Sequence, residues 1–158
     1  MNSTLSLPYQ RLAALGLSLP PVPTPIGRFV NTVEVGPLLY LSGQGPLDAE
    51  GHLHTGKVGR DVSVAAAYEH ARLTGLNLLS VLHGAVGDLG RVQRIVKLLG
   101  FVNAVEDFTE HPAVINGCSD LLCEVFGNIG FHARSAIGVG SLPNNISVEV
   151  EAIFQCAP

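Results

Sequence analysis

Apolar and polar residues alternate with a period of two over several stretches of the chain, which is the spacing of β-strands. The clearest alternation runs through 146–154, where every second side chain is apolar and Glu149 and Glu151 face the other way. The other stretches are rich in β-branched and apolar residues and are bounded by turn-forming residues. Six strands are predicted in all, at 29–35, 38–42, 52–54, 91–103, 134–139 and 146–154.

Two longer segments repeat apolar residues at about 100° per residue, the spacing of an amphipathic helix. The first runs from Asp61, which is suited to cap it, to Val86. The second begins near Pro112, since proline is favoured in a first helical turn, and ends at the glycine-containing segment 127–130. Two helical turns are also predicted at 9–15.

The order of these elements is strands, helix, strand, helix, strands. It predicts an α+β fold in which one mixed, six-stranded sheet carries two helices on one face. Prolines fill the segment 20–25, which must be extended because each proline fixes φ and removes a donor. We therefore divide the chain into an N-terminal extension, 1–24, and one domain, 25–158.

Composition changes this picture in one respect. Apolar residues make up 47% of the 158 residues and charged residues only 14%, so we expect some apolar surface to be buried against other subunits. A net charge of −4 argues against nucleic acid as a partner. Three cysteines favour a reducing compartment over a disulfide framework. With no apolar run near the ~20 residues of a membrane span, we expect a soluble, cytoplasmic protein.

Arg134 is the first candidate for chemistry, because it begins a strand among apolar and small residues. It is either a paired surface arginine or a clamp for a small carboxylate, which a guanidinium can grip with two parallel hydrogen bonds. Glu149 and Glu151 share one face of the last strand, which is either solvated or lines a subunit interface. A carboxylate near an arginine-bound substrate could activate water.

Other candidate motifs are weaker. Ser42-Gly43 follows a strand end and is either a plain turn or a loop that approaches a ligand. His52 and His54 share a strand face, but no third ligand is near them in sequence, which favours solvated side chains over a metal site. The glycines do not form a phosphate-binding or dinucleotide-binding fingerprint.

Three segments carry a resemblance to a known family: IGRFV (26–30), LYLSGQGPLD (39–48) and, most specifically, ARSAIGVGSLPNNISVEVEAI (133–153). They resemble the RidA/YjgF family of reactive-intermediate deaminases, also called endoribonuclease L-PSP, over roughly 25–156. The N-terminal extension and the longer segment at 103–115 are similar to the branch described as YjgF/chorismate-mutase-like endoribonucleases.

The resemblance implies a chorismate-mutase-like fold and a homotrimer. Three sheets would form a central barrel with the helices outside, and ligands would bind in clefts between subunits. Such an assembly would explain the apolar composition. The chemistry of the family implies no cofactor and no metal.

The resemblance also implies roles for individual residues. Arg134 matches the arginine that binds the substrate carboxylate, and Glu149 matches the glutamate that positions or activates the hydrolytic water. Asn116 matches an asparagine that lines the pocket, and Ser42 and Gly43 match the family's SGQ loop.

Two positions depart from the family pattern. Phe29 stands where the deaminases carry a tyrosine, so a hydroxyl is lost from the pocket. Ala136 stands where many members carry a cysteine, which removes an oxidisable thiol.

The leading hypothesis from the sequence is an imine deaminase that hydrolyses amino-acid-derived intermediates of the 2-aminoacrylate type to 2-keto acids and ammonia. A second hypothesis is a module on the same scaffold that binds a small carboxylate without turning it over, which the loss of the hydroxyl at Phe29 favours. A third is the endoribonuclease of the older family label, against which the negative net charge counts.

Overall fold

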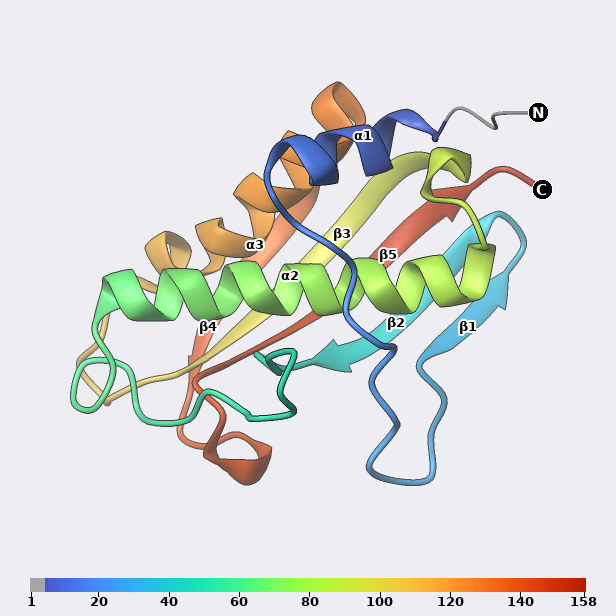
Figure 1. The fold of residues 1–158 in the computed structure, drawn as a ribbon. Helices are drawn as coiled ribbons and strands as arrows, with labels where there is room; N and C mark the ends of the chain where they lie inside the picture. Colours follow the sequence, from blue (N-terminus) through green and yellow to red (C-terminus); the bar gives the residue numbers. More distant parts are fainter. Residues whose placement is uncertain (1–4) are drawn as a thin grey trace.

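The computed structural model describes residues 5–158, and it consists of one mixed sheet with helices packed on one of its faces (Figure 1). The strands lie in the order β1-β2-β5-β3-β4, and only the pairing of β3 with β4 is parallel among them. β5 is the middle strand of this order, and the longer β3 lies between β5 and β4; both strands have neighbours on each side, which suits their β-branched and apolar residues. The strand bounds are β1 Thr32–Val35, β2 Leu38–Gln44, β3 Val92–Asn103, β4 Ala133–Val139 and β5 Val148–Cys156.

Two helices form the layer over the sheet. α2 (Val64–Val86) and α3 (His111–Phe126) run side by side, as Figure 1 shows, and α1 (Leu7–Ala14) packs against α3. The two long helices approach closely at Gly117 of α3, where any Cβ would overlap the backbone carbonyl of Tyr68. The described residues also form three short 3₁₀ turns: η1 Leu89–Arg91, η2 Gly127–Gly130 and η3 Pro143–Asn145.

The sheet has one buried face and one open face. On β5, Val148, Val150, Ala152 and Phe154 are buried under the helices, as the alternation predicted. The opposite face carries side chains that are only partly covered by their own chain, including Tyr40 and Ile137, which are 42% and 44% exposed. The α+β class and the position of the helices are therefore confirmed.

One detail of the prediction is wrong. The sheet has five strands rather than six, because the segment 52–54 forms only an isolated bridge between Leu53 and Leu47. It lies between Gly51 and Gly56, which both have positive φ and bend the chain out of a strand path. The helical turns predicted at 9–15 are confirmed as the helix α1, so the described residues contain three α-helices.

The start of α2 also differs from expectation. Ser63 caps the helix by accepting a hydrogen bond from the backbone amide of Ala66 at 3.1 Å. Asp61 instead turns back to accept from the backbone amide of Lys57 and to pair with Arg60. The hydrogen bond from Arg60 is the main cause that lowers the pKa of Asp61 to about 2. The contacts of Asp61 therefore hold the loop before the helix and do not cap the helix itself.

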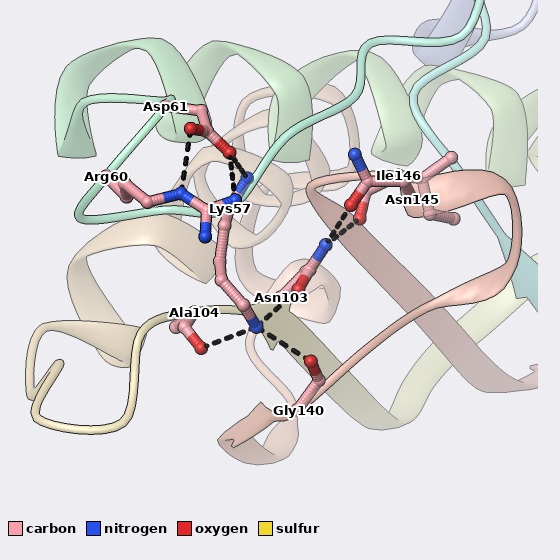
Figure 2. A network of polar contacts seen from close by, with 8 residues as sticks. All are labelled: Lys57, Arg60, Asp61, Asn103, Ala104, Gly140, Asn145 and Ile146. Atoms are coloured by element: carbon pink, nitrogen blue, oxygen red, sulfur yellow. Dashed lines mark hydrogen bonds and ion pairs between the residues drawn. The ribbon is translucent and has the colours of Figure 1, made fainter.

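Lys57 connects this loop to the ends of two strands (Figure 2). Its Nζ donates to the carbonyl oxygens of Ala104 and Gly140 at 3.1 and 2.7 Å, and to Asn103 Oδ1 at 3.2 Å. Asn103 in turn donates to Asn145 Oδ1 and to the carbonyl of Ile146. The network therefore ties η3, which precedes β5, to the body of the sheet.

The N-terminal segment is held against the domain. Tyr9 Oη lies 2.7 Å from His83 Nδ1 of α2 and accepts from the amide of Leu89 at 2.9 Å. The boundary predicted at residue 24 stays a prediction, and residues 1–4 of the predicted extension lie outside the described residues.

In the described part of the chain, none of the helices combines the length and apolarity that a membrane crossing requires.

Candidate active site

Arg134 lies on β4, an outer strand of the sheet, and its side chain faces the helix layer. Its partner in the parallel register is Leu98 of β3, which is fully buried under the helices. Paired residues of neighbouring strands point to the same face. Gly138, four residues further along β4, faces the same way, since a Cβ there would meet the ring of His111 on α3.

The guanidinium of Arg134 rests on two neutral side chains of α3. Nη1 donates to Asn116 Oδ1 at 2.9 Å and to Ser119 Oγ at 3.0 Å. Three ion pairs occur within residues 5–158, and none of them involves Arg134. The partly buried guanidinium of Arg134 therefore has no ion-pair partner, and a carboxylate can bind to it.

Glu149 lies on β5 and faces the opposite side of the sheet. Its register partner is Phe101 on β3, one residue out of phase with the buried Gly100 and Val102. It borders a cleft of about 340 Å³ whose other walls come from the N-terminal segment, the end of β2 and η3, and it is the one charged residue among the described lining residues. The lining comprises Pro23, Thr24, Pro25, Ile26, Phe29, Asn31, Gly43, Gln44, Gly45, Leu47, Leu53, Pro143, Asn144, Ile146 and Glu149.

A β-bulge at the end of β2 makes room for the Glu149 carboxylate. The pairing of β2 with β5 shifts between Leu41 and Gln44, which places Gly43 directly beside Glu149. A Cβ at Gly43 would lie 2.9 Å from Glu149 Cδ and would overlap Oε1. Any larger residue here would force the Glu149 carboxylate to move from this position. The neighbouring Ser42 donates its hydroxyl to the carbonyl of Val30 at 2.7 Å and so fixes the segment that carries Phe29.

The environment of Glu149 changes its acidity. Burial raises the pKa of this carboxyl above the ordinary glutamate value, and the negative charge of Glu151 on the same strand face raises it further. Glu149, like Arg134, takes part in none of the three ion pairs within residues 5–158. The ionised carboxylate is therefore a stronger base than an exposed glutamate, which suits it to accept a proton from water.

The structure brings the predicted site residues together in two groups. Asn116 and Ala136 lie with Arg134 on the helix side of β4, and Phe29 and Gly43 lie with Glu149 in the cleft. Within one chain Arg134 and Glu149 do not meet, because their side chains leave the sheet from opposite faces. Ser42 supports the cleft from outside, since its hydroxyl is bound to the backbone.

Two further polar side chains near Arg134 were missed by sequence reasoning. Ser119 accepts from Arg134 and lies 3.0 Å from His132 Nε2. Ser119 is three residues after Asn116, so both share one face of a helix, and this spacing could have indicated it. His132 gives no such signal, because its partner lies on another element.

Among residues 5–158 no group of three or more His, Cys, Asp and Glu side chains is placed to hold a metal ion. His52 and His54 lie on a loop. His54 stacks on the ring of His70, with the ring centroids 4.6 Å apart, and His70 Nδ1 lies 2.8 Å from Ser147 Oγ.

The fold and the two groups define a class of protein: an α+β scaffold that presents a guanidinium without an ion-pair partner at one edge of its sheet and a half-buried carboxylate on the open face. Comparison with known proteins identifies the class. The family model "YjgF/chorismate mutase-like, putative endoribonuclease" matches residues 9–154. The chain belongs to this family.

Individual relatives support the same assignment. The chain is 42% identical to the protein TCP17 of Trypanosoma cruzi over 145 residues, covering 91% of each. It is 34% identical over 134 residues to a 2-iminobutanoate/2-iminopropanoate deaminase of Salmonella typhimurium, covering 83% of this chain and 89% of the relative. The crystal structure of a protein of unknown function from Agrobacterium tumefaciens superposes with a TM-score of 0.88 at 43% identity, covering 96% of this chain and 94% of that one. The family therefore contains proteins named as imine deaminases.

Proposed function

We propose that the protein hydrolyses imines derived from amino acids to 2-keto acids and ammonia. The observation that carries the proposal is the pair of uncompensated charges, Arg134 and Glu149, each set in a cavity or edge that a small ligand can reach. An imino acid carries a carboxylate, which suits the guanidinium, and an electrophilic carbon, which a water activated by a carboxylate can attack. The relatives named as deaminases support the same reaction class.

Two copies of the chain are needed for this site. Since Arg134 and Glu149 lie on opposite faces of one sheet, we infer that Arg134 of one copy faces the Glu149 cleft of a neighbour. The cleft itself contains no basic residue among its described lining residues, so the substrate carboxylate needs a cation from elsewhere. A homotrimer, as the family resemblance implies, would repeat this junction three times.

The proposed reaction needs no group beyond the two charged side chains and water. Arg134 holds the carboxylate and so fixes the adjacent iminium carbon. Glu149 takes a proton from water while the new C–O bond forms and the C=N π electrons move to nitrogen. The Glu149 proton then passes to nitrogen. As the C–N bond breaks, the hydroxyl oxygen forms the C=O bond, and its proton returns to Glu149 and passes to the departing ammonia. A 2-keto acid and an ammonium ion leave, which balances the iminium and water consumed.

The test is hydrolysis of an imine that an amino-acid oxidase generates in situ from L-alanine or L-leucine, followed as ammonia release. Arg134→Ala is expected to lower kcat/KM by about 100-fold, since loss of one partner of a charged pair costs roughly 2–5 kcal/mol. Arg94→Ala removes an exposed arginine of β3 and serves as the matched control, with unchanged activity expected. Parental turnover by Arg134→Ala would exclude the mechanism.

A second candidate is binding of a small carboxylate without turnover. One observation favours it: Phe29, which is 46% exposed, lines the cleft with an apolar ring where the family resemblance places a tyrosine. Calorimetry with a 2-keto acid, run beside the ammonia assay, separates the two functions. Binding with no ammonia release from any imine would favour the binding module.

A further inference from the structure

The partners of Arg134 continue into a chain of hydrogen bonds that the proposed reaction does not use. Ser119 Oγ, which accepts from Arg134, lies 3.0 Å from His132 Nε2. The other ring nitrogen of His132, Nδ1, lies 2.6 Å from the carbonyl oxygen of Gly130. Ser119 of α3 thus links the guanidinium of Arg134 to His132, which directly precedes β4.

The directions of these hydrogen bonds follow from the groups themselves. A backbone carbonyl only accepts, so His132 Nδ1 carries the hydrogen, and Nε2 of the neutral ring is an acceptor. The single hydroxyl hydrogen of Ser119 is therefore donated to His132. A lone pair of Ser119 Oγ is left for the hydrogen that Arg134 donates.

One nitrogen of Arg134 is fully used by this arrangement. Nη1 has two hydrogens and donates them to Asn116 and Ser119. Every hydrogen bond of the Arg134 side chain within residues 5–158 starts from Nη1. The parallel Nε–H and Nη2–H groups remain for a ligand, and this edge of a guanidinium matches the two oxygens of a carboxylate.

We propose that Ser119 and His132 are positioning residues that present the Nε–Nη2 edge of Arg134 to the carboxylate of the imino acid. The inference rests on the proposed function, because it assigns these residues a task at the same site. Asn116 and Ser119 together hold the guanidinium plane at two points. Without Ser119 the plane can turn, and the carboxylate then meets a mobile charge instead of a fixed pair of donors.

The arrangement depends on a neutral His132. Burial lowers the pKa of His132, the hydrogen bond to the Gly130 carbonyl raises it, and the charge of Arg134 lowers it again. Arg134 is the charged group that faces the ring; Ser119 from α3 and the Gly130 carbonyl from η2 face it without charge. Protonation of His132 turns Nε2 from an acceptor into a donor and places a second positive charge near the guanidinium. Acid should therefore break the hydrogen bond from Ser119 to His132 and weaken the positioning of Arg134.

The test compares four variants with the parent protein in imine hydrolysis and in calorimetric binding of the corresponding 2-keto acid. Ser119→Ala and His132→Ala are each expected to raise KM and the keto-acid Kd about tenfold, with a smaller effect on kcat. Ser119→Thr keeps the hydroxyl and should restore most of the affinity. Ser18→Ala removes an exposed hydroxyl from the N-terminal segment and serves as the control, in which KM and the keto-acid Kd should be unchanged.

Two measurements separate positioning from a merely structural role. The parental KM should rise on acidification through the lowered pKa of His132, whereas His132→Gln, which offers an acceptor but does not titrate there, should lack this rise. The double variant Ser119→Ala/His132→Ala should bind no worse than Ser119→Ala, because residues acting in series do not add.

The inference is wrong if Ser119→Ala and His132→Ala keep the parental KM and keto-acid Kd, or if Ser119→Thr is as impaired as Ser119→Ala. An Arg134→Lys variant distinguishes this failure from failure of the proposed function. If Arg134→Lys loses binding while the Ser119 and His132 variants do not, only the positioning role fails. If the parent protein releases no ammonia from any imine tested, the proposed function fails, whatever the Ser119 and His132 variants do to keto-acid binding. Keto-acid binding is read without turnover, so an inactive protein still gives an answer.

Discussion

Arg134 and Glu149 are charges for which their own chain supplies no counter-ion among residues 5–158. Some other charged residues do find partners: Arg72, for example, pairs with Glu124 across α2 and α3. Arg134 and Glu149 are opposite in sign, and their side chains leave the sheet from opposite faces. Complementary charges of this kind favour a junction between copies over a contact within one copy.

The pH dependence of activity tests the role of Glu149. Glu151 raises the pKa of Glu149, so Glu151→Gln should lower it and keep the base ionised to more acidic pH. The acid limb of the kcat/KM profile should therefore move to lower pH in this variant. The profile is measured as ammonia release between about pH 4 and 8, across the ordinary glutamate range.

Glu34→Gln is the matched control for that experiment, because it removes an exposed glutamate on β1. Its acid limb should coincide with that of the parent. An acid limb that is identical in Glu151→Gln and in the parent would mean that Glu149 is not the group whose ionisation controls the reaction.

Gly43 tests the geometry around the same carboxylate. Gly43→Ala places a methyl group where Glu149 lies, so the carboxylate must move and activity should fall at least tenfold. Stability should change by less than about 2 kcal/mol, since a side chain and not the backbone has to give way. Gly140→Ala, whose Cβ would meet open space, should behave like the parent. Equal activity of the two variants would contradict the assigned position of Glu149.

At the residue scale the sequence identifies the two charged residues but not their relation. The alternation of β5 places Glu149 on the polar face, and the structure agrees. The face of Arg134 depends on its register with β3, which spacing within one strand does not reveal. The Ser119–His132 contact likewise depends on how α3 packs on β4.

At the scale of elements, the close contact of α2 and α3 depends on one glycine. Gly117→Ala would press a methyl group against the backbone of Tyr68, and the methyl carbon would lie 3.0 Å from the backbone nitrogen of Arg72. Neither backbone can move without separating the helices, so we expect a loss of several kcal/mol in the free energy of unfolding. Chemical denaturation followed by circular dichroism measures it.

Gly84→Ala is the matched control on α2. Its Cβ would meet only the side chain of Val22, which is 46% exposed and can move. Alanine is favoured over glycine in a helix by about 1 kcal/mol, so this variant should be neutral or more stable. If both glycine variants lose the same stability, the tight contact at Gly117 is not what sets the helix spacing.

The elements that the sequence predicts well are those with long, regular patterns. α3 begins at His111, directly before the predicted Pro112, and β5 keeps the predicted alternation. The errors fall on short segments, where local bonds compete with regular structure. The loop before α2 is closed by the contact of Lys57 with Asp61, so the helix is capped by Ser63 and begins at Val64 instead.

At the scale of the whole molecule, the open face of the sheet is incompletely covered by its own chain. Val33 and Val35 of β1 are 52% and 59% exposed, and Tyr40 and Ile137 lie on the same side of the sheet. This surface agrees with the apolar composition that led us to expect buried contacts between subunits. The symmetry of such an assembly depends on contacts between copies, which neither the sequence pattern nor one chain contains.

The central claim is that Arg134 of one copy and Glu149 of another form one site, and mixing two inactive variants tests it most directly. Arg134→Ala and Glu149→Gln proteins are unfolded together, refolded at equal concentrations and assayed for imine hydrolysis. If the site is shared, random assembly places an intact arginine beside an intact glutamate at about one site in four, and about a quarter of the parental activity should return. If the mixture stays as inactive as either variant alone, although size-exclusion chromatography shows mixed assemblies, the shared site is excluded.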